Sequence, residues 1–217
     1  MVNKMKLQVA LDFGTIEEAK EILRDIGEYI DIVEIGAIST PYGYAALREL
    51  KAEFPDLEYL ADIKIADGGN YFANELHKQG ADYVTVLGIV EDETIKGAIQ
   101  AGKETGIKVV ADMLGCRNFL ERVKELDEMG IDYISVHTPA DIQATHTPFE
   151  HLKFARMIVK NAKLSVAGGI SPDNIKEVLP YRPEIIISGS ALTGSGDRKA
   201  AAKALRAAID NAEKNDN

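Results

Sequence analysis

The chain has 217 residues and a formal net charge of −10, with 46% hydrophobic and 28% charged residues. This is the composition of a globular protein, and its acidic balance argues against nucleic acid as a partner, because phosphate backbones are bound by clustered Lys and Arg. No apolar run is long enough for a signal peptide or a transmembrane helix, and Cys116 is the only cysteine. We therefore expect a cytoplasmic protein with no membrane partner, no intrachain disulfide and no thiolate metal cluster.

Short runs rich in Val, Ile and Leu alternate along the chain with longer stretches of helical period. Eight of these runs are expected to be strands: residues 6–12, 29–36, 58–64, 82–88, 107–113, 132–137, 163–169 and 184–190. The stretches between them carry apolar residues at helical spacing, and Gly80, Gly106 and Gly130 are expected to end helices.

Eight strand–helix units in one short chain predict an α/β fold, a single (β/α)8 TIM barrel that comprises residues 1–217. An open doubly wound sheet is the alternative. Such a sheet normally has a glycine-rich turn after its first strand, and residues 12–15 (DFGT) do not form one. No linker interrupts the pattern, so we expect one domain.

Polar residues stand at the carboxyl ends of the expected strands, where barrels of this type carry their chemistry. They are Asp12, Glu34, Asp62, Lys64, Asp67, Asp112 and His137. An isolated Asp at such a position is more often a helix cap or a solvated loop residue. Seven polar residues at the same rim instead indicate an active site.

The alternation of side chains across a strand sharpens this prediction. Asp62 and Lys64 share one face of the third strand, whereas Ile63 faces the helices, so the acid and the amine are expected in the barrel mouth. By the same alternation, Asp12 points inward with Gln8.

These side chains suit enolate chemistry with a divalent cation. A buried Lys64 beside carboxylates stays charged and can stabilise an enolate oxygen. Glu34 and Asp62 can together hold Mg²⁺, which takes few protein carboxylates and keeps positions for water and substrate. His137 is the candidate general base or acid. The alternatives are a structural ion-pair network in residues 62–67 and a buried, satisfied His137.

Two glycine-containing pairs follow the last two strands. Gly168 and Gly169 come after the seventh strand, with Ser171 expected to cap a helix, and Gly189 and Ser190 come after the eighth. Loops at these positions often bind phosphate through backbone N–H groups. We therefore expect a phosphosugar as the ligand.

Residues 61–69 (ADIKIADGG) carry the D-x-K-x-x-D signature, and by it the chain resembles the orotidine 5′-monophosphate decarboxylase superfamily. The rest is similar to the metal-dependent branch, which contains 3-hexulose-6-phosphate synthase and 3-keto-L-gulonate-6-phosphate decarboxylase. The segments that carry this similarity are 7–12, 33–36, 80–88, 94–98 and 167–170.

This resemblance implies a homodimer with its sites at the subunit interface, where Asp67 reaches the partner's site. Glu34 and Asp62 would bind Mg²⁺, and Lys64 would stabilise a 1,2-enediolate. His137 would move protons, and the glycine turns would hold the phosphate. The expected catalytic set is Asp12, Lys64, Asp67, Asp112 and His137.

Four residues favour the synthase pattern within the branch. Asp112, Thr138 and Ala167 stand where the decarboxylase pattern has Glu, Arg and Thr. Ala140 replaces a second Arg that helps to protonate the enediolate, which leaves the enediolate free to attack formaldehyde. The implied reaction is the Mg²⁺-dependent condensation of D-ribulose 5-phosphate with formaldehyde to D-arabino-hex-3-ulose 6-phosphate.

The chain departs from the synthase pattern at Pro139, at Thr145 and His146, and in the loop 37–42, which is one residue shorter. Three alternatives therefore stand beside the synthase. They are decarboxylation of 3-keto-L-gulonate 6-phosphate, epimerisation of ribulose phosphate, and a non-catalytic phosphosugar-binding barrel. Epimerisation normally needs metal-binding histidines at two early strand ends, where this chain has Glu34 and Asp62.

Overall fold

A computed structural model describes residues 4–12 and 14–214, in which eight parallel strands close into a barrel in chain order, with the last strand pairing with the first. The strands are β1 (Lys6–Leu11), β2 (Ile32–Ile35), β3 (Glu58–Ile65), β4 (Tyr83–Leu87), β5 (Lys108–Asp112), β6 (Tyr133–His137), β7 (Lys163–Ala167) and β8 (Ile185–Ser188). Each overlaps a predicted strand, although most are shorter than predicted, and the (β/α)8 barrel is confirmed.

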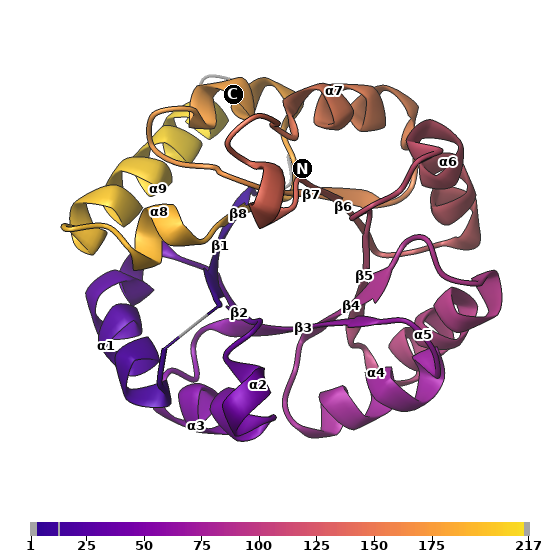
Figure 1. Cartoon of the computed structure of the whole chain (residues 1–217), viewed down its shortest axis with the longest axis horizontal. Coiled ribbons are helices and arrows are strands. Elements are labelled where there is room, and N and C mark those ends of the chain that lie inside the picture. Colours follow the sequence, from indigo (N-terminus) through magenta and orange to yellow (C-terminus); the bar gives the residue numbers. More distant parts are fainter. Residues whose placement is uncertain (1–3, 13, 215–217) are drawn as a thin grey trace.

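Helices surround the ring of strands (Figure 1). They are α1 (Ile16–Ile26), α2 (Ser39–Tyr42), α3 (Ala45–Glu53), α4 (Gly69–Lys78), α5 (Asp92–Thr105), α6 (Phe119–Met129), α7 (Phe149–Ile158), α8 (Ser190–Thr193) and α9 (Arg198–Lys214). Thr15 and Glu18 form a capping box that starts α1. Gly106 and Gly130 end α5 and α6 in the left-handed conformation, as predicted, and Gly80 follows α4 at positive φ.

Apolar side chains fill two regions, one between the strands and the helices and one inside the barrel. The first holds the outward-facing residues of the strands, such as Leu7, Val9 and Leu11 of β1. The second is a plug within the ring, made of Ile32, Leu60, Tyr83, Val110, Tyr133 and Ile185. Because this plug fills the barrel below the carboxyl ends of the strands, a ligand can enter only at those ends.

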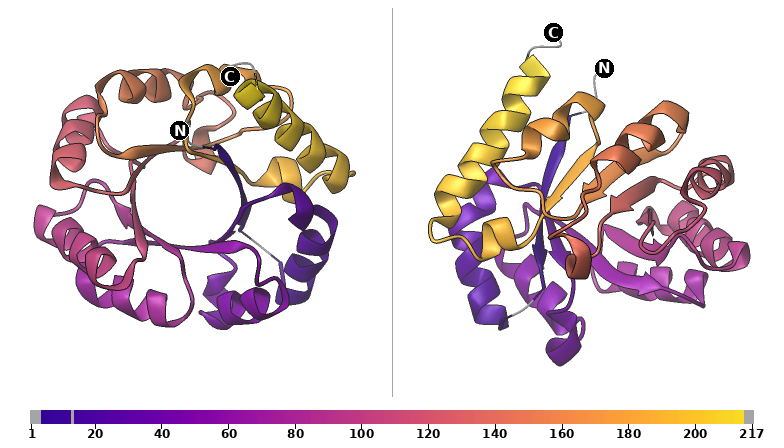
Figure 2. Two further views of the ribbon diagram at one scale, coloured as in Figure 1. Left: turned by 180° about the vertical axis from the view of Figure 1, so that it is seen from behind. Right: turned by 45° about the horizontal axis from the view of Figure 1, so that its top comes forward.

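The first strand begins, and the last helix ends, at the same end of the barrel (Figure 2, right). There the Met5 amide donates to Glu213 Oε1 at 2.5 Å, and Arg206 Nη2 donates to the Met5 carbonyl at 3.1 Å. These bonds tie α9 to the amino-terminal end of β1 and leave the opposite rim to the loops. In the described part of the chain, no helix is long and apolar enough to cross a bilayer.

The segment after β7 differs from the prediction, because Ser171 does not cap an α-helix. Two short 3-10 helices follow instead, η3 (Ile175–Glu177) and η4 (Leu179–Tyr181). The Asn174 side chain accepts from the Ser171 amide at 2.9 Å and donates to the Gly169 carbonyl at 2.8 Å, which closes a turn in place of a first helical turn.

Candidate active site

A cavity of about 830 Å³ lies at the carboxyl ends of the strands. Its lining includes nearly all of the predicted site: Asp12, Glu34, Asp62, Lys64, Asp112, His137, Gly168, Gly169, Gly189 and Ser190. The fold therefore brings together side chains that lie as far apart in sequence as β1 and β8.

Asp67 is the one predicted site residue that does not line the cavity of its own chain. It lies exposed between β3 and α4, and its carboxylate accepts the Gly68 amide at 2.7 Å. Two large apolar side chains of α4 stand nearby in sequence, with Tyr71 65% exposed and Phe72 40% exposed.

The carboxyl half of β3 is irregular, and this irregularity places Lys64. Ala61 pairs with Val84 and Ile65 pairs with Val86, so three residues of β3 stand opposite one residue of β4. Lys64 itself has φ +47°, a left-handed conformation that is unusual for a residue with a side chain. Because the excess is two residues, the alternation is kept, and Asp62 and Lys64 face the cavity as predicted.

Lys64 is held between two carboxylates. Its ammonium forms an ion pair with Asp62, and Nζ lies 3.7 Å from Asp112 Oδ2. Burial works to lower the pKa of Lys64, but the charge and hydrogen bond of Asp62, with the charges of Asp112 and Glu34, raise it above the usual lysine value. Lys64 is therefore a fixed cation at physiological pH.

Asp112 orients His137. Asp112 Oδ2 lies 2.9 Å from His137 Nδ1, and Oδ1 accepts the Leu114 amide at 3.0 Å. Burial raises the pKa of Asp112, but the hydrogen bond and charge of His137 and the charge of Lys64 outweigh it and hold the pKa below the usual value. An ionised Asp112 accepts a hydrogen bond from the Nδ1–H group, which leaves Nε2 of His137 as the basic nitrogen.

The pKa values of Asp12 and Glu34 are raised, in contrast to that of Asp112. Burial, and then repulsion from Asp62, raises the pKa of Asp12, and burial with repulsion from Asp62 and Asp12 raises the pKa of Glu34 well above its usual value. A Cβ at residue 36 would collide with Asp12 Oδ1, so a side chain there would displace the Asp12 carboxylate. The carboxyl groups of Asp12 and Glu34 therefore resist ionising together, and full ionisation would leave more negative charge on this side of the cavity than Lys64 balances.

The donor set fits a hard divalent cation. Glu34 and Asp62 offer carboxylate oxygens from adjacent strands, and the buried Gln8 Oε1 has no hydrogen-bond partner among the described residues. Gln8 Nε2 holds Glu34 Oε2 at 2.5 Å. Within residues 4–12 and 14–214, no three His, Cys, Asp or Glu side chains form a metal-binding group. A cation bound here would therefore complete its shell with other oxygens.

The turn after β7 brings backbone close to the cavity. Gly168 and Gly169 have φ values of 118° and 68°, which favour glycine. A Cβ at Gly168 would lie 2.7 Å from the Thr138 carbonyl oxygen, so a side chain would push the turn away from the loop after β6. The bare turn lets amide groups face a ligand.

The loop after β6 forms one wall of the cavity, where Figure 1 shows it over the ends of β7 and β8. Pro139, Ala140 and Gln143 line this wall, and Gln143 Nε2 donates to the Thr138 carbonyl at 3.1 Å. We did not predict a role for Gln143. His146, in contrast, is exposed, and in the described part of the chain its side chain bonds only to the neighbouring Thr145.

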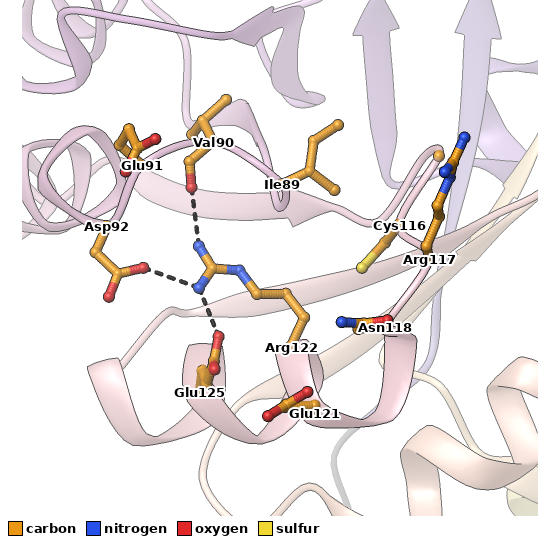
Figure 3. Close-up of a pocket in the computed structure, with 11 residues that line it drawn as sticks. Ile89, Val90, Glu91, Asp92, Cys116, Arg117, Asn118, Glu121, Arg122 and Glu125 are labelled. Carbon is orange, nitrogen blue, oxygen red and sulfur yellow. Dashed lines mark hydrogen bonds and ion pairs between the residues drawn. The ribbon is translucent and has the colours of Figure 1, made fainter.

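A second hollow, of about 560 Å³, lies outside the barrel mouth between the loops after β4 and β5 and helix α6 (Figure 3). Arg122 occupies it. Its guanidinium donates to the carbonyls of Gly88 and Val90 and pairs with Asp92 and Glu125 at 2.8 and 2.7 Å. These contacts fasten the β4 loop to α6, which makes Arg122 a structural residue.

A family model described as "Orotidine 5'-phosphate decarboxylase / HUMPS family" matches residues 5–205. The chain belongs to this family. Among its relatives, 3-hexulose-6-phosphate synthase of Bacillus subtilis (strain 168) is 41% identical over 207 residues, which cover 94% of this chain and 99% of the relative.

Solved structures also resemble this chain over nearly its whole length. 3-Hexulose-6-phosphate synthase from Salmonella typhimurium matches with a TM-score of 0.93 at 37% identity, over 96% of this chain and 100% of that one. 3-Keto-L-gulonate-6-phosphate decarboxylase from Vibrio cholerae matches with a TM-score of 0.84 at 25% identity, over 96% and 98%. These relatives are named as enzymes, and the prediction that this family member is an enzyme is confirmed.

Proposed function

We propose that this enzyme condenses D-ribulose 5-phosphate with formaldehyde to D-arabino-hex-3-ulose 6-phosphate, and that it can catalyse the reverse cleavage. The relatives named 3-hexulose-6-phosphate synthase support this choice across nearly the whole chain. The observation that carries it within the family is Ala140, which lines the cavity where the decarboxylase pattern has a proton-donating Arg. None of the described lining residues is an arginine.

The cavity supplies a base and a cation for an enediolate. His137 Nε2 takes a proton from C1 of ribulose 5-phosphate, and the electron pair of that C–H bond forms the C1–C2 double bond. The negative charge moves to the C2 oxygen, where Lys64 stabilises it. C1 then attacks the formaldehyde carbon, and the carbonyl oxygen of formaldehyde takes a proton from the His137 imidazolium. The glycine turns after β7 and β8 hold the phosphate.

Mg²⁺ is the cofactor we propose, with Glu34 and Asp62 as its protein ligands. When bound, it would supply Lewis acidity towards the sugar oxygens. The raised pKa of Glu34 supports the proposal, because buried carboxylates that repel one another gain from a divalent cation. Asp12 adds to the same negative field from β1.

We also propose that the chain acts as a homodimer in which Asp67 serves the partner's cavity. Two features support this arrangement. Asp67 is exposed outside its own cavity. Tyr71 and Phe72, four and five residues later in the first turn of α4, form an exposed apolar surface. Large exposed aromatic side chains are typical of protein interfaces.

The test is to mix purified protein with ribulose 5-phosphate, formaldehyde and MgCl₂ and to follow the loss of formaldehyde, with EDTA as the metal-free control. We expect metal-dependent loss, and a Lys64→Ala variant should lose nearly all activity. Full activity of Lys64→Ala would contradict the mechanism. If formaldehyde is not consumed, release of CO₂ from 3-keto-L-gulonate 6-phosphate would assign the decarboxylase reaction instead. Saturable ribulose 5-phosphate binding without turnover would indicate a binding protein.

A further inference from the structure

Thr85 of β4 occupies the place where the β3–β4 ladder is interrupted. It is the single residue of β4 that stands opposite residues 62–64, and only 5% of it is exposed. The backbone N–H of Lys64 donates to Thr85 Oγ1 at 2.9 Å. The hydroxyl of Thr85 thus provides the acceptor that a regular strand would supply as a carbonyl.

The same hydroxyl donates to Asp62 Oδ1 at 2.7 Å. A hydroxyl carries one proton, and a backbone N–H can only donate. The Thr85 hydroxyl therefore accepts from Lys64 and gives its own proton to the bond with Asp62. The other oxygen of Asp62, Oδ2, pairs with Lys64 Nζ. One buried hydroxyl is therefore bonded to the backbone of the cation and to the side chain of its counter-ion.

We propose that Thr85 is a positioning residue for the reaction, which holds Lys64 in its left-handed conformation and fixes the rotamer of Asp62. This inference rests on the proposed function for its kinetic consequence, but the hydrogen bonds can be tested without it. Without the hydroxyl, the Lys64 amide loses its acceptor, and Asp62 is free to turn away from the cation. The ammonium then spends less time where the enediolate charge develops.

The experiment compares Thr85→Val, which keeps the β-branched shape, with Thr85→Ser, which keeps the hydroxyl. Ser165→Ala is the matched control, because Ser165 is equally buried on β7 and its Oγ has no partner among the described residues. We expect Thr85→Val to lower kcat about 10- to 100-fold, with little change in KM for ribulose 5-phosphate, because lost supporting hydrogen bonds have effects of this size. Thr85→Ser should recover most of the loss, and Ser165→Ala should behave as the parent.

Hydrogen exchange of the Lys64 amide, followed by NMR, is the readout that needs no turnover. Exchange should be faster in Thr85→Val than in the parent and Thr85→Ser. If the parent enzyme fails to consume formaldehyde but the exchange pattern holds, the proposed function is overturned and the Thr85 contacts stand. Unchanged exchange in Thr85→Val, or equal kinetic loss in the Val and Ser variants, would overturn the role of Thr85.

Discussion

Asp112 Oδ2 and His137 Nδ1 lie 2.9 Å apart, on neighbouring strands β5 and β6. This hydrogen bond decides which imidazole nitrogen of His137 is basic. A variant that reverses the tautomer of His137 therefore tests the role of Asp112. In Asp112→Asn, the amide group can donate to Nδ1 and so turn the proton towards Nε2. We expect kcat to fall about 10³- to 10⁴-fold while ribulose 5-phosphate still binds. Isothermal titration and steady-state kinetics measure the two effects, with the exposed Asp173→Asn as a control.

Removal of the charge on Glu34 should stabilise the metal-free protein and abolish its response to Mg²⁺. The folded-state pKa of Glu34 is raised, so its contribution to stability is lost as the pH rises and the buried carboxyl ionises. In EDTA at pH 8, Glu34→Gln should therefore unfold with a free energy about 1–3 kcal/mol higher than the parent. The difference should shrink as the pH falls. Denaturant titrations with and without MgCl₂ test this, and equal stabilisation of both proteins by Mg²⁺ would refute the ligand assignment. Glu177→Gln, at an exposed position, is the control.

Subunit mixing tests the proposed position of Asp67. Asp67→Ala and Lys64→Ala are each expected to be inactive as homodimers. If Asp67 acts on the partner's cavity, a mixed dimer regains one complete site, so an equal mixture after subunit exchange should show about one quarter of the parental activity. If both residues served the same chain, no mixture would recover activity. A mixture of the two variants before exchange is the baseline.

Asp127, near the end of α6, should make the free energy of unfolding decrease at low pH. Its carboxylate accepts the amides of Lys160, Asn161 and Ala162 at 3.1, 2.9 and 2.7 Å. Burial raises the pKa of Asp127, but these hydrogen bonds outweigh it and hold the pKa below the usual value. The stabilisation is therefore complete above the ordinary Asp value of about 4 and is lost as the pH falls through the lower folded value. Asp127→Asn should cost about 2–3 kcal/mol at pH 7, and thermal melts of variant and parent should draw together as the pH falls below the ordinary Asp value of about 4.

The inward-facing residues could be predicted because alternation along a strand is a local property of the chain. Gln8 and Asp12 lie inside the barrel, and Leu7 lies among the helices, as the pattern indicates. Asp62 and Lys64 also face inward although β3 is irregular between them. The pattern gave the right answer there only because the irregularity adds an even number of residues.

Contacts that do not follow from strand alternation could not be predicted in the same way. The sequence after β7 has the residues of a helix start, but the turn is decided by Asn174 bonding back to the Gly169 carbonyl. Thr85 looks like any strand residue until β3 is placed beside it. The role of Asp67 depends on a second chain, which neither local pattern nor a single protomer contains.

The two extra residues of β3 restrict how this segment can change in evolution or in design. A deletion of one residue between Ala61 and Lys64 would turn either the acid or the amine onto the helical layer and bring an isoleucine into the mouth. A deletion of two would restore a regular ladder but remove part of the D-x-K spacing itself. The length of this segment can therefore change only in steps of two residues if the side chains are to keep their faces. A new chemistry at this site would then arise by substitutions on the other strands and loops.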